Sequence, residues 1–237
     1  MMVLGLCAFL VPALNQAKPN ILLVVADDLG YADVDFQEHS AAVVKTPHLN
    51  ELAMGGVRLV NHHVQPFCSP TRATLMTGRH VLRYGLQNTV IWPQDAWALP
   101  SNETFIAQNM RSAGYKTAQF GKWHLGLYNE AALPLARGFG EQYGYYLGGE
   151  DYYSHTRKGS GVNGLDWHRN DTLCASENGT YSAVLIGNAA TAFVRKHSAV
   201  DTPWFLYLPF QSVHSPMEAP THDPPRYPAL SGNVQKR

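Results

Sequence analysis

The residues CSPTRATLMTG, from Cys68 to Gly78, carry the strongest local signal in the chain. Ser69 and Pro70 are typical of a helix start, since serine caps free backbone N–H groups and proline fits the first turn. Gly78 is typical of a helix end. The sequence therefore predicts a short helix with Cys68 just before its N-terminus. That end favours an anion, because its unpaired N–H groups and its dipole both point there.

Arg72 follows about one turn after Cys68 and faces the same end of the helix. A thiol-derived nucleophile, an anion-binding helix end and a fixed guanidinium together suit chemistry on sulfate or phosphate esters. In an oxidising compartment a disulfide between Cys68 and Cys174 is the ordinary alternative. We expect Cys68 to stay unpaired instead, because it stands at the mouth of the anion site.

The composition is that of a balanced globular protein. The 237 residues include 18 Lys and Arg against 18 Asp and Glu, so no net charge attracts nucleic acid or an anionic membrane. The length suits one large domain or two small ones. The 11 histidines leave room for metal binding or acid–base chemistry. We expect no nucleic-acid partner and no membrane span.

Residues 1–17 resemble a secretory signal peptide, with an apolar core from Val3 to Val11. A basic n-region is absent, so a buried first strand or a mis-assigned start is the alternative. Three sequons, at Asn102, Asn170 and Asn178, are candidate glycosylation sites and fit a secretory route. We therefore expect a lysosomal or extracellular destination.

The rest of the chain alternates between expected strands and helices. This predicts an α/β fold with a mostly parallel central sheet and helices on both faces. Ile21–Ala26 is a continuous apolar run, as in a central strand covered on both faces. Residues 143–164, rich in Gly and Tyr, are expected to form a long loop. Further strands are expected at residues 57–64, 115–120 and 204–208, and helices at 47–53, 103–112 and 181–197, the last burying Leu185, Ala189, Ala192 and Phe193.

Charged side chains follow three of these strands, where ligands bind in open α/β sheets. Asp27 and Asp28 follow the first strand and would suit Ca²⁺ or Mg²⁺, the alternative being an ordinary polar turn. Lys122 and His124 follow a second strand, and each alone would be an unremarkable polar residue. His214 follows the last strand and could donate a proton, unless it is a loop residue beside the next proline. Together these placements predict one site.

The pattern Cys-x-Pro-x-Arg followed by Leu-x-Thr-Gly in residues 68–78 resembles the signature of the type I sulfatases. Residues 114–124 are similar to that family's second signature, and residues 20–30 to its opening strand with a metal-binding aspartate pair. The resemblance covers nearly the whole chain. It implies an alkaline phosphatase-like fold, with residues 18–237 forming the N-terminal portion of the sulfatase catalytic domain.

Within that family, residues 90–93, 137–139 and 149–155 look most similar to the arylsulfatase B group, the N-acetylgalactosamine-4-sulfatases. The group's substrates imply sulfated sugars of glycosaminoglycans. The chain departs from the group in lacking its cysteines, with Gln94, Trp97 and Ala132 standing in those neighbourhoods. The disulfide arrangement of the group is therefore absent, which weakens the substrate assignment more than the reaction class.

The resemblance also implies a nucleophile and a metal site. In this family the cysteine, here Cys68, is oxidised to formylglycine by a formylglycine-generating enzyme, and the hydrated aldehyde is the nucleophile. Asp27, Asp28 and the modified residue 68 would bind Ca²⁺, or Mg²⁺ in its place. Arg72 would hold the formylglycine hydroxylate.

Three further roles follow from the same resemblance. Lys122 would bind the sulfate oxygens. His124 would take the remaining hydroxyl proton of formylglycine to eliminate sulfate. His214 would contact the substrate and protonate the leaving alcohol. The implied function is hydrolysis of a small-molecule or glycan sulfate ester.

The family's second metal-ligand pair, an Asp-Asn followed by Gly, has no match in this chain. A proline-rich tail, Pro216 to Pro228, follows the last expected strand instead. We therefore expect the N-terminal part of a sulfatase that binds calcium weakly and hydrolyses aryl sulfates slowly or not at all, with residues 204–210 as an uncovered strand edge. The alternatives are an inactive fragment or a related phosphonate or phosphodiester hydrolase.

Overall fold

The computed structural model describes residues 18–37, 44–159 and 161–220. The expected signal peptide, residues 1–17, and most of the proline-rich tail lie outside the described residues.

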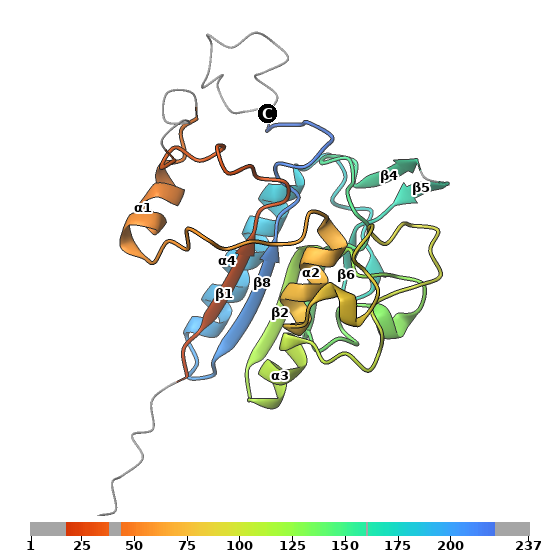
Figure 1. The fold of residues 1–237 in the computed structure, drawn as a ribbon, viewed down its shortest axis with the longest axis horizontal. Coiled ribbons are helices and arrows are strands. Elements are labelled where there is room, and N and C mark those ends of the chain that lie inside the picture. Colours follow the sequence, from red (N-terminus) through yellow and green to blue (C-terminus); the bar gives the residue numbers. More distant parts are fainter. Residues whose placement is uncertain (1–17, 38–43, 160, 221–237) are drawn as a thin grey trace, which may run out of the picture.

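A six-stranded sheet in the order β1-β8-β2-β3-β6-β7 forms the centre of the fold (Figure 1). Four strands run parallel, namely β1 (Ile21–Val25), β8 (Trp204–Pro209), β2 (Lys116–Lys122) and β3 (Glu141–Tyr145). Two short strands extend the sheet antiparallel, β6 (His168–Arg169) and β7 (Thr172–Leu173). A separate antiparallel hairpin consists of β4 (Thr156–Gly159) and β5 (Val162–Leu165).

Helices cover both faces of the sheet, which confirms the expected fold class (Figure 1). On one face lie α2 (Cys68–Thr77) and α3 (Ile106–Ser112), and on the other lies α4 (Ser182–Ser198). The expected helix after Thr46 is also present as α1 (Pro47–Gly55). The described residues also contain two 3-10 turns, η1 (Val81–Arg83) and η2 (Glu130–Ala132).

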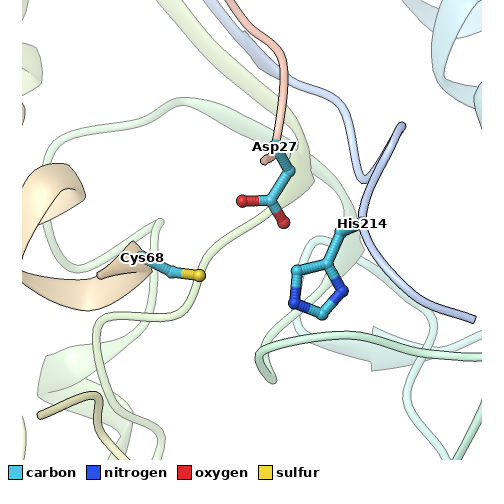
Figure 2. A group of neighbouring side chains, drawn as sticks. All are labelled: Asp27, Cys68 and His214. Carbon is cyan, nitrogen blue, oxygen red and sulfur yellow. The ribbon is translucent and has the colours of Figure 1, made fainter. Parts of the chain in front are cut away.

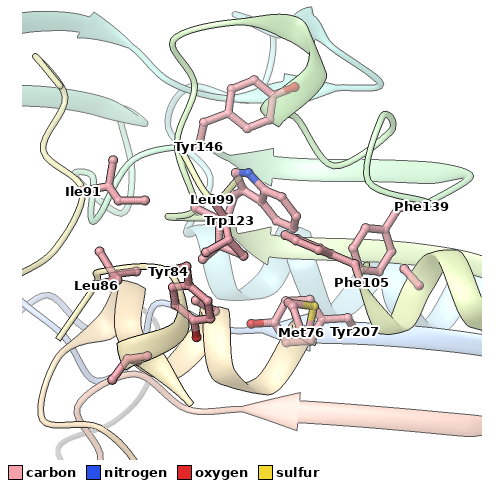
Figure 3. Packing of buried hydrophobic residues seen from close by; sticks show 14 of the residues in the cluster. Met76, Tyr84, Leu86, Ile91, Leu99, Phe105, Trp123, Phe139, Tyr146 and Tyr207 are labelled. Atoms are coloured by element: carbon pink, nitrogen blue, oxygen red, sulfur yellow. The ribbon is translucent and has the colours of Figure 1, made fainter. Parts of the chain in front are cut away.

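The alternation of β8 explains why two hydrophobic cores form. Phe205 and Tyr207 point to the side of α2 and α3 and belong to the cluster of buried residues on that side. Figure 3 shows Tyr207 there with Trp123 and Phe139. Leu206 and the other residues of even number point to the opposite side, against α4. A strand buried on both faces in this way must lie inside the sheet. The sheet in turn holds β1, β8 and β2 in parallel, so that their carboxyl ends meet at one edge.

Two expectations about strand order are wrong. Among the described residues β1 pairs with β8 alone, and Leu22 and Val24 are 50% and 53% exposed, so β1 is not a strand covered on both faces. β8 lies between β1 and β2 and is buried throughout, so residues 204–210 do not form an uncovered edge. An apolar run predicts a strand, but it does not encode which strands become its neighbours.

Residues 57–64 form no strand, contrary to expectation. Val57, Leu59 and Val60 are at least 70% exposed, and no described segment pairs with them. Residues 143–164 are also not one long loop, because they contain the end of β3 and the β4–β5 hairpin.

Two helices differ in detail from the sequence-based expectation. α3 begins at Ile106, later than expected, and the Gln108 side chain accepts the backbone N–H of Phe105 at 2.8 Å just before it. In α4 the Ala192 side chain is exposed. The buried face of α4 consists of Ser182, Ile186, Ala190, Phe193 and His197.

Candidate active site

Helix α2 begins at Cys68, with Phe67 at the N-cap position. Ser69 is therefore not the cap that its residue type suggests. Its hydroxyl is buried and accepts the backbone N–H of Ile91 at 3.1 Å, which attaches residues near 91 to the start of the helix. Gly78 ends the helix as expected, with a left-handed φ of 65°. Cys68 thus lies in the first turn, where the free N–H groups favour an anion.

The strand ends bring two predicted residues to Cys68. The backbone N–H of Asp27 donates to the carbonyl oxygen of Ser212 at 2.9 Å, and Val213 donates to Asp27 O at 2.8 Å. These bonds join the segments after β1 and β8. Ligand atoms of Asp27, Cys68 and His214 consequently lie within 4.8 Å of one another. Figure 2 shows the three side chains converging from separate elements.

Asp27 forms a buried charged triad with two cations. Its Oδ1 accepts from Arg72 Nη2 at 3.1 Å and its Oδ2 from Lys122 Nζ at 2.5 Å. Arg72 also donates through Nη1 to the hydroxyl of Tyr207 at 3.3 Å. All three charged side chains are at most 5% exposed. Arg72 and Lys122 therefore lie beneath Asp27, and the sulfate contact expected of Lys122 stays a prediction.

The triad sets the protonation of its neighbours. Burial raises the pKa of the Asp27 carboxyl, but the charges of Arg72 and Lys122 outweigh this and hold the pKa below its ordinary value. Burial and the charge of Arg72 lower the pKa of Lys122, while the Asp27 carboxylate opposes this shift, and the two basic side chains together place positive charge under Cys68. Burial likewise raises the Cys68 pKa, yet a hydrogen bond with His214 and the charges of Lys122 and Arg72 lower it overall. The site favours an anion at residue 68.

His124 is held neutral. Burial, followed by the charges of Lys122 and Arg72, lowers its pKa well below the ordinary value. Its Nε2 lies 3.1 Å from the carbonyl oxygen of Ile91, which accepts but cannot donate a hydrogen bond. The proton of the neutral ring is therefore on Nε2. The buried Nδ1 has no hydrogen-bond partner among the described residues, so its lone pair can accept a proton.

Gly148 makes room for this histidine. A Cβ atom at position 148 would stand 2.5 Å from Cε1 of His124, inside van der Waals contact. Only glycine lets the chain pass so close to the imidazole ring. Nothing in the sequence around Gly148 indicates this contact, because it depends on tertiary packing.

His214 and Asp28 form the outer side of the site. The hydrogen bond with Cys68 raises the pKa of His214 against the opposing effect of burial. Its Nε2 lies 3.7 Å from Oδ2 of Asp28, whose side chain is 64% exposed. Asp28 and His124 both have left-handed backbone conformations, with φ of 57° and 55°. Such conformations are uncommon outside glycine and are frequent at functional sites.

A cavity of about 440 Å³ opens over these residues. Four predicted site residues line it, namely Cys68, His124, His214 and Asp28. Trp92 and Arg157 line it as well, although sequence reasoning did not select them. Arg157 lies in a segment that was expected to be a loop, and there an isolated arginine gives no signal of a site. Tyr207 was also missed, though the alternation of β8 places it on the face of Arg72.

The donors partly fit a divalent cation. An ionised Asp27 within 4.8 Å of Cys68 and His214, together with the Asp28 carboxylate near His214, suits a hard cation such as Ca²⁺. Both oxygens of Asp27 already accept bonds from cationic side chains, however, and Ca²⁺ takes about six to eight oxygens. Asp27 and Asp28 therefore supply part of a shell.

Four other features of the structure bear on the sequence analysis. Cys68 and Cys174 are both free thiols. The expected glycosylation sites are all exposed, at Asn102, Asn170 and Asn178. Asn102 stands in a turn before α3 rather than at its start. Across the described ranges, none of the helices has the length and apolar character that a membrane crossing needs.

Comparisons with known proteins point to one family. The sulfatase family model matches residues 19–237. Arylsulfatase J of Mus musculus is 37% identical over 87% of this chain and 34% of its own length. Arylsulfatase A of Homo sapiens is 42% identical over 51% of this chain and 24% of its own length. The chain thus spans about a third or less of these curated relatives.

Solved structures agree with these sequence matches. The crystal structure of Ps i-CgsB in complex with k-i-k-neocarrahexaose superposes with a TM-score of 0.82 and 31% identity, covering 92% of this chain and 50% of that one. The match of the family model spans almost all of the sequence, including every residue of the cavity. The chain belongs to the sulfatase family.

Proposed function

We propose that this protein hydrolyses sulfate esters in the cavity over Cys68. The observation that carries the proposal is the position of Cys68 in the first turn of α2, within 4.8 Å of Asp27 and His214 and above two buried cations. A helix end and a positive layer stabilise the negative charge of a transferring sulfuryl group. Membership of the sulfatase family supports the same reaction.

The nucleophile in this proposal is formylglycine, made from Cys68 by a formylglycine-generating enzyme, and it supplies a hydrated aldehyde. Arg72 and Lys122 hold the negative charge that gathers at residue 68. His124 accepts a proton at its bare Nδ1, which the structure leaves without a partner among the described residues. His214, whose Nε2 lies 3.7 Å from Asp28 on the outer side of the site, donates a proton to the leaving alcohol.

Asp27 and Asp28 would hold a divalent cation, which we propose to be Ca²⁺ with Mg²⁺ as the substitute. Such an ion adds positive charge beside the sulfate. The lowered pKa of Asp27 keeps its carboxylate ionised for this purpose. Further oxygen ligands have to complete the shell.

The substrate class that we propose is a sulfated sugar, as in the glycosaminoglycan substrates of the arylsulfatase B group. A cavity of about 440 Å³ has room for a sugar ring beyond the sulfate. The relative Ps i-CgsB, 31% identical, was solved in complex with a neocarrahexaose. Exposed sequons and the resemblance of residues 1–17 to a signal peptide support a secretory route to the lysosome or the cell exterior.

The reaction class can be tested with chromogenic esters. The protein from a eukaryotic secretory host should cleave an aryl sulfate much faster than the matching aryl phosphonate. Cys68→Ala should abolish turnover, whereas Cys174→Ala, at the other free thiol, should retain it. Preference for the phosphonate would favour the phosphohydrolase alternative, and equal rates for both cysteine variants would contradict a nucleophile at residue 68.

A further inference from the structure

The cavity has a second polar wall that the proposed hydrolysis does not use. Arg157 comes from β4 and lines the cavity together with Trp92, which follows the segment attached to Ser69. Neither residue belongs to the charged triad or to the two histidines. Their presence raises the question of what a cation and an indole recognise beside a sulfate site.

The Arg157 guanidinium has unused hydrogen-bonding capacity. Its Nη1 donates to the carbonyl oxygen of Gly149 at 3.3 Å, which orients the group. Its Nε is buried and has no hydrogen-bond partner in the described part of the chain. Asp166 lies near enough to feel the charge of Arg157, but its two oxygens accept backbone N–H groups of Tyr146 and Leu147 at 3.1 and 2.8 Å. Nη2 of Arg157 forms no hydrogen bond or ion pair within the described part of the chain, so Arg157 can still bind an anion through this nitrogen.

The chemistry of that anion follows from the residue type. A guanidinium presents parallel N–H groups that match the two oxygens of a carboxylate or of a sulfate. The sulfate that is hydrolysed lies beside Cys68, over the charged triad. Arg157 is therefore available to bind a second anionic group. Trp92 is 43% exposed and offers an apolar ring face at the same cavity. A sugar ring carries both an apolar C–H face and charged substituents, and so it fits this pair.

We propose that Arg157 and Trp92 form a subsite for the sugar next to the sulfated one in an acidic oligosaccharide. Arg157 binds the carboxylate or second sulfate of that sugar, and Trp92 packs against its ring. The proposal rests on the proposed function, since it places the neighbouring sugar relative to a sulfate at Cys68. This subsite would make the protein bind acidic glycans more tightly than isolated aryl sulfates.

Binding can be measured by calorimetry in a Cys68→Ala background, where no turnover consumes the probe. The first probe is a disaccharide with one sulfate ester and a carboxylate on the neighbouring ring. The second is its methyl ester, and the third carries a second sulfate in place of the carboxylate. The variants are Arg157→Ala, Arg157→Lys and Trp92→Ala. The matched control is Lys158→Ala, which removes an exposed charge of the same sign from the next residue of β4.

Arg157→Ala should weaken the affinity for the matching acidic disaccharide about tenfold to a hundredfold, the range expected for a hydrogen-bonded charge pair. Lys158→Ala should change it less than about threefold. Arg157→Lys should have an intermediate affinity, because a single ammonium charge replaces the paired N–H groups of the guanidinium. Trp92→Ala should weaken all three probes alike. The neutral methyl ester should show little dependence on Arg157, and the carboxylate and second-sulfate probes identify which anion it binds.

Equal losses for Arg157→Ala and Lys158→Ala, or an Arg157 dependence no larger for the acidic probes than for the methyl ester, would overturn the subsite. The two proposals fail separately. A wild-type protein that cleaves no sulfate ester would refute the proposed function, while the titration, which needs no turnover, would still measure Arg157.

Discussion

Because Asp27 is the only carboxylate of the buried triad, we expect it to stabilise the fold as well as to set the charge of the site. Asp27→Asn keeps the shape of the side chain but removes its charge, which leaves Arg72 and Lys122 buried together without a counter-charge. All three side chains are at most 5% exposed, so solvent screens this repulsion poorly. We expect the free energy of unfolding to fall by about 3–5 kcal/mol, as when one partner of a buried ion pair is removed.

A surface pair supplies the control. Lys196 Nζ lies 2.8 Å from Glu141 Oε1, but the two side chains are 63% and 39% exposed. Lys196→Ala should therefore cost no more than about 1 kcal/mol. In the double variant Asp27→Asn, Lys122→Met one buried cation is gone, and the loss should be smaller than the sum of the single losses by about 2 kcal/mol.

Urea unfolding at pH 7, followed by circular dichroism, measures Asp27→Asn, Lys122→Met, their double variant and Lys196→Ala. A loss below about 1 kcal/mol for Asp27→Asn would refute the reasoning, because it would mean that the two cations need no counter-charge. Strict additivity in the double variant would also refute it.

Three further predictions use other parts of the structure. Gly148→Ala should displace His124 and lower kcat for an aryl sulfate about a hundredfold. The control is Gly164→Ala, where an added Cβ meets no atom within 4 Å and kcat should not change. Equal kcat values for the two variants would contradict the packing argument. Burial raises the pKa of Asp166 to about 7 against opposing backbone hydrogen bonds, so the folded state binds an extra proton and stability falls as pH rises from about 4 to 7. Urea unfolding at several pH values gives the free energy of unfolding of wild type and of Asp166→Asn as a function of pH. The slopes of these two plots should differ by on the order of 1 kcal/mol per pH unit over that range, and parallel plots would contradict the prediction. Enzymatic deglycosylation of protein from a secretory host should lower its apparent mass. An unchanged mass would mean that none of the exposed sequons, at Asn102, Asn170 and Asn178, carries a glycan.

Much of the fold could be predicted because local patterns decide it. The apolar runs of β1 and β8 and the glycine after α2 are each local signals, and the structure contains all three elements. The order of strands could not be predicted in the same way. Whether β1 or β8 lies inside the sheet depends on which neighbours pair, and no residue within either run encodes that choice.

The candidate site shows the same division. Asp27 and His214 were predicted together because the carboxyl ends of parallel strands meet at one edge of a sheet, and the resemblance to the sulfatases added Cys68 to the same site. The sequence did not predict that Lys122 and Arg72 bond to Asp27 from below, since that depends on side-chain packing. The sequence around Gly148 and Arg157 has no regular alternation of apolar and polar residues. The roles of these two residues depend on the groups that pack around them.

The central claim is that residue 68 becomes the nucleophile of a sulfate-binding site. Mass spectrometry of the tryptic peptide from Leu59 to Arg72 tests it most directly, on protein that has passed through a eukaryotic secretory compartment. We predict a peptide whose mass shows an aldehyde in place of the Cys68 thiol. A peptide that carries only the intact thiol, or one linked to Cys174, would contradict the account.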